Sequence, residues 1–171
     1  MESYMGDQIV IIFLLIIANG IFAMSEMSIV SSHKARLETL ADEGSKSAAA
    51  VLKLRVNPNK MFSTVQFGIT LISLLTGVYG GTTMAGPLSE YVEKIDFLQP
   101  YAYSVSMFVI VAGITYFTLV LGELAPKRIA IDNPERLACF IARPMLFFSR
   151  LCTPIVWFLS ASTALVVSLL G

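Results

Sequence analysis

The stretch IVIIFLLIIANGIFAMSEMSIV, residues 9–30, decides the fold class of this chain. A helix of this length extends about 33 Å, enough to cross a hydrocarbon core about 30 Å thick. Two further apolar runs, 61–81 and 102–122, are similar in length. The sequence therefore predicts an all-α membrane protein with three transmembrane helices, at 9–30, 61–81 and 102–122.

The composition of the chain supports the same class. Of its 171 residues, 56% are hydrophobic and 14% are charged, and the mean hydropathy is +0.74. Soluble domains carry about 25% charged residues, and so short and apolar a chain cannot hide all its hydrophobic surface in one soluble core. The net charge of +0 gives no sign of the basic surface that binds nucleic acid. We therefore expect the lipid bilayer as a partner and no nucleic acid.

The segment between the first two spans predicts two short amphipathic helices lying against the cytoplasmic membrane surface. Gly44 and Ser45 separate two apolar stripes of helical spacing, which are Leu37, Leu40, Ala41 and Ala49, Leu52, Val56. A soluble hairpin that only connects the spans is the alternative. In the second span, Gly77 and Gly81 form a small-xxx-small pair, which predicts close packing of this face against another helix.

A fourth apolar region, 137–170, is less regular than the three spans. Two arginines and two prolines interrupt it, namely Arg143, Pro144, Arg150 and Pro154. Its last part, 151–170, is long enough to cross the bilayer on length alone.

The distribution of lysine and arginine predicts the orientation. Six lie in 31–60, one lies in 82–101, and five follow Glu123. Because cytoplasmic loops carry the excess of positive charge, we expect a multi-pass protein of the cell (inner) membrane with its N-terminus outside. The first loop and everything after Glu123 would then lie at the cytoplasmic face.

Polar side chains recur on helical stripes inside the three spans, where each must find a partner. Asn19 and Glu26 share one face of the first span, beside Ser25, Ser28 and Ser32. The second span carries Gln66, Thr70 and Ser73, and the third carries Thr115, Thr118, Gly122 and Glu123. Serine and threonine can bond back to their own helix, so one stripe alone is weak evidence. Three stripes and two carboxylates predict a shared cavity in the cytoplasmic half.

Glu123 is the strongest candidate ligand in this cavity. Pro126 has no N–H with which to pair the Gly122 carbonyl, which predicts a bare backbone oxygen beside the carboxylate. Carboxylate, carbonyl and hydroxyl oxygens suit Mg²⁺ or Na⁺. The alternative is that Glu123 ends a helix at the membrane interface and pairs with Lys127 at i, i+4.

The remaining reactive side chains do not indicate an enzyme. Cys139 and Cys152 lack the spacing of a metal motif and sit in apolar surroundings. His33 is the single histidine and is expected to be a solvated interface residue. No nucleophile–base pair is evident, so we expect no catalytic residues.

Three motifs resemble the transmembrane domain of the cyclin M/CorC family of magnesium transporters, with the haemolysin-like members most similar. They are IFAMSEMSIVSSHKARLETLADEG at 21–44, TVQFGITLISLL at 64–75 and LGELAPKRIA at 121–130. The resemblance implies a homodimer with three transmembrane helices per subunit, and a juxtamembrane belt at 137–170 on the cytoplasmic side. Residues 1–171 would form a single transmembrane domain. Cytoplasmic nucleotide-binding domains, where ATP is expected, would follow residue 171.

The resemblance also assigns positions. Glu123 matches the acidic residue before the family's proline, Ser25-Glu26 matches its first-helix pair, and 68–73 matches its second-helix ion motif. The chain departs from the better-studied members at Ala23, where they have serine, and at Ile69, Thr70 and Ser73, where they have asparagines.

The predicted function is that of a membrane domain of a divalent-cation transporter, exporting Mg²⁺ with coupling to Na⁺. The alternative is a non-transporting sensor or anchor for cytoplasmic regulatory domains. The predicted metal ligands are Glu123, Gly122, Ser25, Ser28, Thr70, Ser73 and Gly68. Further cavity residues are Glu26, Gln66, Asn19, Pro126 and Lys127.

Overall fold

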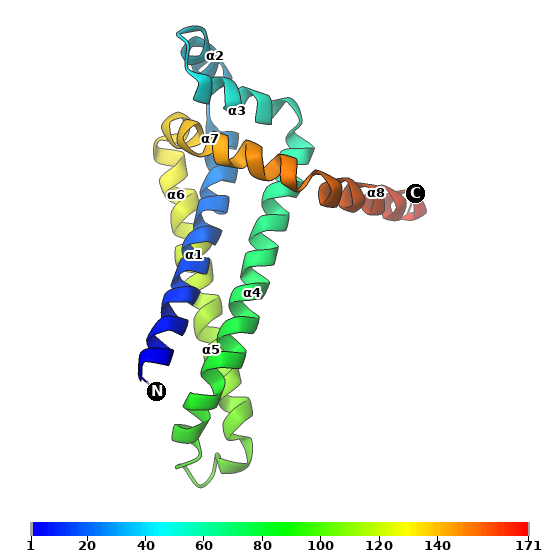
Figure 1. The fold of residues 1–171 in the computed structure, drawn as a ribbon. Coiled ribbons are helices and arrows are strands. Elements are labelled where there is room, and N and C mark those ends of the chain that lie inside the picture. The colour runs from blue at the N-terminus through cyan, green and yellow to red at the C-terminus, as the bar shows by residue number, and fades with distance from the viewer. Residues whose placement is uncertain (1, 171) are drawn as a thin grey trace. The chain divides into compact units, whose positions relative to one another are not determined.

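A computed structural model describes residues 2–170, and over these the chain forms helices and no strands. This confirms the all-α class. In chain order (Figure 1) the elements are α1 (Glu2–Ser31), α2 (Lys34–Asp42), α3 (Lys46–Val56), α4 (Pro58–Val92), the 3-10 helix η1 (Gln99–Tyr101), α5 (Ala102–Leu119), the π-helix η2 (Val120–Leu124), α6 (Ala125–Asp132), α7 (Pro134–Leu151) and α8 (Thr153–Leu170).

Three helical stretches are long and apolar enough to cross a membrane: Gly6–Ser31, Pro58–Val92 and Gln99–Asp132. They confirm the three predicted spans, and the second and third run further than predicted. In α4, the polar residues after Gly81 do not end the helix. The hydroxyls of Thr82 and Thr83 donate to the carbonyls of Val78 and Tyr79 one turn earlier. Because these hydroxyls are satisfied within the helix itself, they are compatible with its continuation.

The chain divides into two compact units. The first is formed by residues up to Gly20 and by Thr70–Ala125, and the second by Ile21–Ile69 and the residues from Pro126 onward. Helices α1 and α4 contribute residues to both units.

In the first unit, glycines of α4 allow close packing of the helices. A methyl group at Gly80 would overlap the side chain of Ile114 in α5 and would lie 3.2 Å from Ile12 Cδ1 in α1. At Gly81 it would lie 3.0 Å from Met107 Sδ, also in α5, whereas at Gly77 nothing lies within 4 Å. The predicted helix contact is therefore present at Gly81, but Gly80 makes the tighter contact and Gly77 faces open space within this chain.

In the second unit, α2 and α3 form a helical hairpin, and α3 packs against α7. The turn requires Gly44, whose φ of +93° is costly for residues with a side chain, and Ser45 caps α3 by accepting the Ala48 N–H. The two short predicted helices are confirmed, but the buried residues of α3 are not those predicted. They are Ala48, Ala50, Val51 and Leu54, whereas Val56 is 82% exposed. Helix α3 packs against α7.

The fourth apolar region forms two helices, α7 and α8, which meet at a bend of 68°. Buried residues of α7 recur at helical spacing, and they include Ala138, Ile141, Ala142 and Met145. Its other face exposes Phe140 and Phe147. Helix α7 is thus amphipathic, and α7 with α8 meets the length and hydropathy of a span only as a bent pair.

The two glycines of α4 provide a matched test of this packing. Alanine in place of glycine favours a helix by up to about 1 kcal/mol, so Gly77→Ala should leave the melting temperature in detergent unchanged or raise it. Gly80→Ala gains the same propensity but must displace Ile114 and crowd Ile12. We expect it to melt at a lower temperature than Gly77→Ala, and equal melting temperatures would contradict the close contact.

Candidate functional site

Glu123 lies in a π-helical turn that interrupts the third span. Helix α5 ends at Leu119, and in η2 the Ala125 N–H donates to the carbonyl of Val120, five residues earlier. Pro126 follows directly and cannot donate a backbone hydrogen bond. Short π-helical turns are rare inside helices and occur frequently at functional sites.

The buried side chain of Asn19 joins three elements of the first unit. Its Nδ2 donates to the Gly122 carbonyl in η2 at 3.0 Å, and its Oδ1 accepts from Ser73 Oγ in α4 at 3.4 Å. The turn approaches α1 so closely that a methyl group at Gly122 would lie 3.2 Å from both Asn19 Nδ2 and the Ile16 carbonyl oxygen. The prediction of a bare Gly122 carbonyl is wrong, because Asn19 donates to it.

A cavity of about 140 Å³ lies beside this junction within the first unit. It is lined by Ser73 and Gly77 of α4, by Ile114, Thr115, Thr118 and Leu119 of α5, and by Glu123 of η2. Thr118 Oγ1 is buried and has no hydrogen-bond partner among the described residues. Leaving a buried hydroxyl without a partner costs about 1–3 kcal/mol. The residues that line the cavity therefore combine a carboxylate with hydroxyl groups, and the hydroxyl of Thr118 has no hydrogen-bond partner among the described residues.

The oxygen atoms of the residues that line this cavity are suited to ligating a cation, and most of them are neutral. No group of three or more histidine, cysteine, aspartate or glutamate side chains that could hold a metal occurs among the described residues. A cation here would meet the Glu123 carboxylate and the hydroxyls of Ser73, Thr115 and Thr118. Such hard oxygens suit Mg²⁺ and Na⁺, and they do not suit zinc or copper.

Other predicted ligands have structural roles in the second unit. The hydroxyls of Ser25 and Ser28 are buried and donate to carbonyls of α1 itself, those of Ile21 and Ser25. A methyl group at Gly68 would lie 2.7 Å from the Phe22 ring, so Gly68 serves close packing.

The structure also shows where the remaining predicted cavity residues lie. Glu26 Oε2 lies 3.5 Å from Lys127 Nζ, and both side chains are partly buried. Pro126 is buried in α6. Gln66 and Thr70 are exposed residues of α4.

Sequence reasoning found the polar stripes but not the way in which Asn19 connects them. Thr115 and Thr118, three residues apart on α5, both line the cavity. Nothing in the local sequence indicates which hydroxyl of a stripe bonds back to its own helix.

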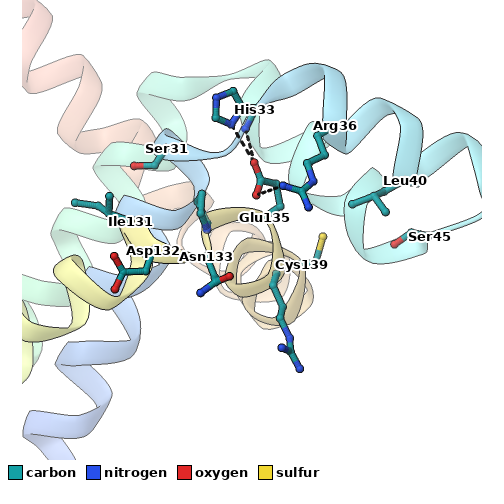
Figure 2. A pocket seen from close by; sticks show the side chains of 12 residues that line it. Ser31, His33, Arg36, Leu40, Ser45, Ile131, Asp132, Asn133, Glu135 and Cys139 are labelled. Carbon is teal, nitrogen blue, oxygen red and sulfur yellow. Dashed lines mark hydrogen bonds and ion pairs between the residues drawn. The ribbon is translucent and has the colours of Figure 1, made fainter.

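A second cavity, of about 800 Å³, belongs to the second unit and is lined by both acidic and basic residues (Figure 2). The Glu135 carboxylate lies between His33 and Arg36. Its Oε1 accepts from the His33 backbone N–H at 3.1 Å and lies 3.1 Å from His33 Nδ1, and its Oε2 lies 3.6 Å from Arg36 Nη1. The backbone hydrogen bond from His33 is the main cause that lowers the pKa of Glu135 below its usual 4.5. The His33 ring is 82% exposed, as predicted, but it also helps to hold α7.

Sequence comparison decides the family. Residues 9–171 match the family model described as "Cyclin M transmembrane N-terminal domain". The chain belongs to this family. Similar curated proteins are the UPF0053 protein sll0260 of Synechocystis sp., 48% identical over 94% of this chain, and the UPF0053 protein YhdP of Bacillus subtilis, 31% identical over 95%. A protein of Escherichia coli named "Polyamine export protein" is 32% identical over 90%.

This cyclin M transmembrane domain spans about a third of the length of these relatives, since the matches cover 36%, 37% and 34% of their chains. The family establishes a membrane protein with several apolar helices.

The Asn19 junction can be tested by an isosteric substitution. Asn19→Leu removes both hydrogen bonds and leaves the Gly122 carbonyl and the Ser73 hydroxyl to find other partners in an apolar setting. We expect a loss of about 1–3 kcal/mol in stability, the cost of a buried unsatisfied polar group, measured by thermal unfolding in detergent. Ser25→Ala is the control, because that hydroxyl bonds only within α1. Equal losses of stability in the two variants would contradict the role of Asn19 in joining the helices.

The Glu135 carboxylate predicts a pH dependence. Its pKa is lower in the folded protein than in the unfolded chain, so its stabilising effect is complete above the usual value of 4.5 and is lost as the pH falls through the folded pKa. We expect Glu135→Gln to lower the melting temperature at pH 7, and this difference from the unsubstituted protein should shrink at pH 4 and below. Glu38→Gln, which alters an exposed ion pair with Lys34, should change the melting temperature little at pH 7 and at pH 4. A difference for Glu135→Gln that does not change with pH would contradict this role.

Proposed function

We propose that this chain is the membrane domain of a divalent-cation transporter and that its cargo is Mg²⁺, exported from the cell with Na⁺ as the coupling ion. The observation that carries the proposal is the cavity beside η2. It combines the Glu123 carboxylate with three hydroxyl-bearing side chains, and the Oγ1 of one of them, Thr118, is buried without a hydrogen-bond partner among the described residues. An intramembrane carboxylate that faces a cavity is expensive to keep and typically marks an ion pathway.

The ligand chemistry supports a magnesium ion as cargo. Mg²⁺ takes about six oxygens near 2.1 Å and gives up its water reluctantly, so it needs few protein ligands. Glu123 would supply the charge, and the hydroxyls of Ser73, Thr115 and Thr118 would supply neutral oxygens. At about 30 Å³ per water molecule, a cavity of about 140 Å³ can also hold water that stays on the ion.

The proposal includes the setting of this domain. We propose a homodimer in the cell (inner) membrane with its N-terminus outside, an orientation supported by the excess of lysine and arginine in 31–60 and after Glu123. Nucleotide binding, with ATP as the ligand, would belong to cytoplasmic domains of the complete protein. The domain itself would move ions and catalyse no covalent chemistry.

A polyamine is the second candidate cargo, because a relative 32% identical to this chain is named "Polyamine export protein". A polyamine distributes several ammonium groups along an extended chain. Glu123 is the one carboxylate among the residues that line the cavity beside η2, so this cavity favours a compact ion. A sensor that binds Mg²⁺ without moving it is the third alternative.

Glu123→Gln tests the proposal because it keeps the shape of the side chain and removes its charge. The unsubstituted protein should be stabilised by Mg²⁺ by about 2.7 kcal/mol at a concentration of 100 times Kd, and it should release Mg²⁺ from loaded vesicles. We expect Glu123→Gln to lose both effects while remaining folded. The measurements are Mg²⁺-dependent melting temperature and flux reported by a Mg²⁺-sensitive dye.

Two variants serve as comparisons. Glu26→Gln makes the same chemical change at a carboxylate paired with Lys127, and it should retain Mg²⁺ stabilisation. Thr118→Val replaces a hydroxyl that has no hydrogen-bond partner among the described residues with a methyl group. The variant should be at least as stable without Mg²⁺, and adding Mg²⁺ should stabilise it less. Mg²⁺ stabilisation of Glu123→Gln would refute the site. Stabilisation of the unsubstituted protein without flux would favour the sensor, and stabilisation by spermidine but not Mg²⁺ would favour the polyamine.

A further inference from the structure

We propose that the second unit contains a binding site for the phosphate group of an anionic membrane lipid. The site lies where the end of α3, the start of α4 and the end of α7 meet. A cavity of about 200 Å³ is lined there by three cationic side chains, Lys53, Lys60 and Arg150, and by the polar side chains of Asn57 and Ser149.

No ion pair within residues 2–170 neutralises the positive charge in this cavity. No acidic residue is among those that line the cavity. In the part of the chain that the structure describes, the ion pairs use other cations, namely His33, Lys34, Arg36 and Lys127. Three like charges around one small space repel each other, and an anion between them relieves this repulsion.

The neutral groups at the cavity also favour an anion. Asn57 caps α4, since its Oδ1 accepts the Lys60 backbone N–H at 3.2 Å. That bond turns the amide oxygen toward the helix backbone, and the amide nitrogen can donate to an anion. Lysine and arginine head groups are donors only, and phosphate oxygens are acceptors, so the two sets match and form charge-assisted hydrogen bonds.

The position of the cavity favours a phosphate carried by a lipid over a free one. The second candidate span begins at Pro58, so Asn57 and Lys60 lie at the end of a span, where lipid head groups are found. Two strongly exposed apolar residues adjoin the cations: Val56, which is 82% exposed, precedes Asn57, and Leu151, which is 65% exposed, follows Arg150. Acyl chains would cover these side chains, and a soluble anion would not.

Another cavity of the second unit, separate from the one at Glu135, provides room for part of an acyl chain. It measures about 260 Å³, and its lining is apolar except for Arg55, with Ile29, Val30, Pro58, Met61 and Phe62. The Arg55 guanidinium donates to the carbonyls of Ile29 and Ser32. Met61 lines both cavities. A basic cavity and an apolar one therefore adjoin each other in the same unit, as the head and tail of one lipid require.

Helix electrostatics alone could account for two of the cations. Lys53 lies in the last turn of α3 and Arg150 in the last turn of α7, where positive charge stabilises the helix C-terminus. Lys60, by contrast, lies in the first turn of α4, where a positive charge opposes the helix dipole. That unfavourable position is explained if Lys60 binds an anion.

The experiment measures lipid binding to the purified chain in a neutral detergent. Phosphatidylglycerol and phosphatidylcholine with identical acyl chains are titrated separately, and the melting temperature reports binding. We expect phosphatidylglycerol to stabilise the protein more than phosphatidylcholine does. Lys53→Gln, Lys60→Gln and Arg150→Gln should each weaken its binding about five-fold, the increment expected for one lysine or arginine beside an anionic lipid surface.

The controls distinguish a local binding site from general electrostatic attraction between the protein and an anionic lipid. Arg143→Gln changes an exposed arginine of α7 that does not line the cavity, and it should leave the affinity within about two-fold. Equal losses in Arg143→Gln and Lys60→Gln would overturn the site in favour of diffuse surface charge. Equal stabilisation by inorganic phosphate would overturn the lipid as the ligand, and equal stabilisation by both lipids would overturn head-group recognition. Lys60→Gln is decisive if Arg150→Gln unfolds, because Lys60 does not support a helix C-terminus.

Discussion

The arrangement of the first unit depends on one buried amide. The Asn19 side chain connects α1 by hydrogen bonds to both α4 and η2, at Ser73 and Gly122. Nonpolar contacts between helices in lipid gain little from the hydrophobic effect, because lipid tails are as apolar as the side chains. Hydrogen bonds and close backbone approach therefore define which helices meet and in which register. The absence of a side chain at Gly122 lets the π-helical turn come near enough to α1 for the amide to reach it.

The other polar residues of the spans fall into two groups according to where their hydrogen bonds go. Ser25, Ser28 and Thr76 donate to carbonyls of their own helices, so they carry no interaction between elements. The hydroxyl of Ser73 donates instead to Asn19, and Thr118 Oγ1 has no hydrogen-bond partner in the described part of the chain. The residues available to an ion are thus fewer than the polar residues of the spans. They gather at η2, where the regular backbone pattern is interrupted.

Length and hydropathy were sufficient to predict the helical class and the three spans, because a membrane constrains both. The ends of the spans were less predictable, since serine and threonine can be satisfied by the preceding turn and so need not end a helix, as in α4. The prediction for the buried residues of α3 was wrong by one or two positions, because a weakly amphipathic helix does not reveal which side meets α7. The buried residues are Ala48, Ala50, Val51 and Leu54. Asn19 was recognised as a cavity residue, but its partner Gly122 lies 103 residues away, and no local pattern encodes such a contact.

The basic residues used to predict the orientation are not equivalent in the structure. Arg55 donates to the carbonyls of Ile29 and Ser32 and so caps the end of α1, while Arg36 and Lys34 pair with carboxylates. These cations are engaged by the protein. Lys53 and Lys60 form no such pairs among the described residues and line one cavity. The positive-inside rule counts every lysine and arginine alike, but a cation without an acidic partner is more available to bind a lipid head group. Some of the positive charge from which the orientation is predicted thus forms the lipid site that we propose.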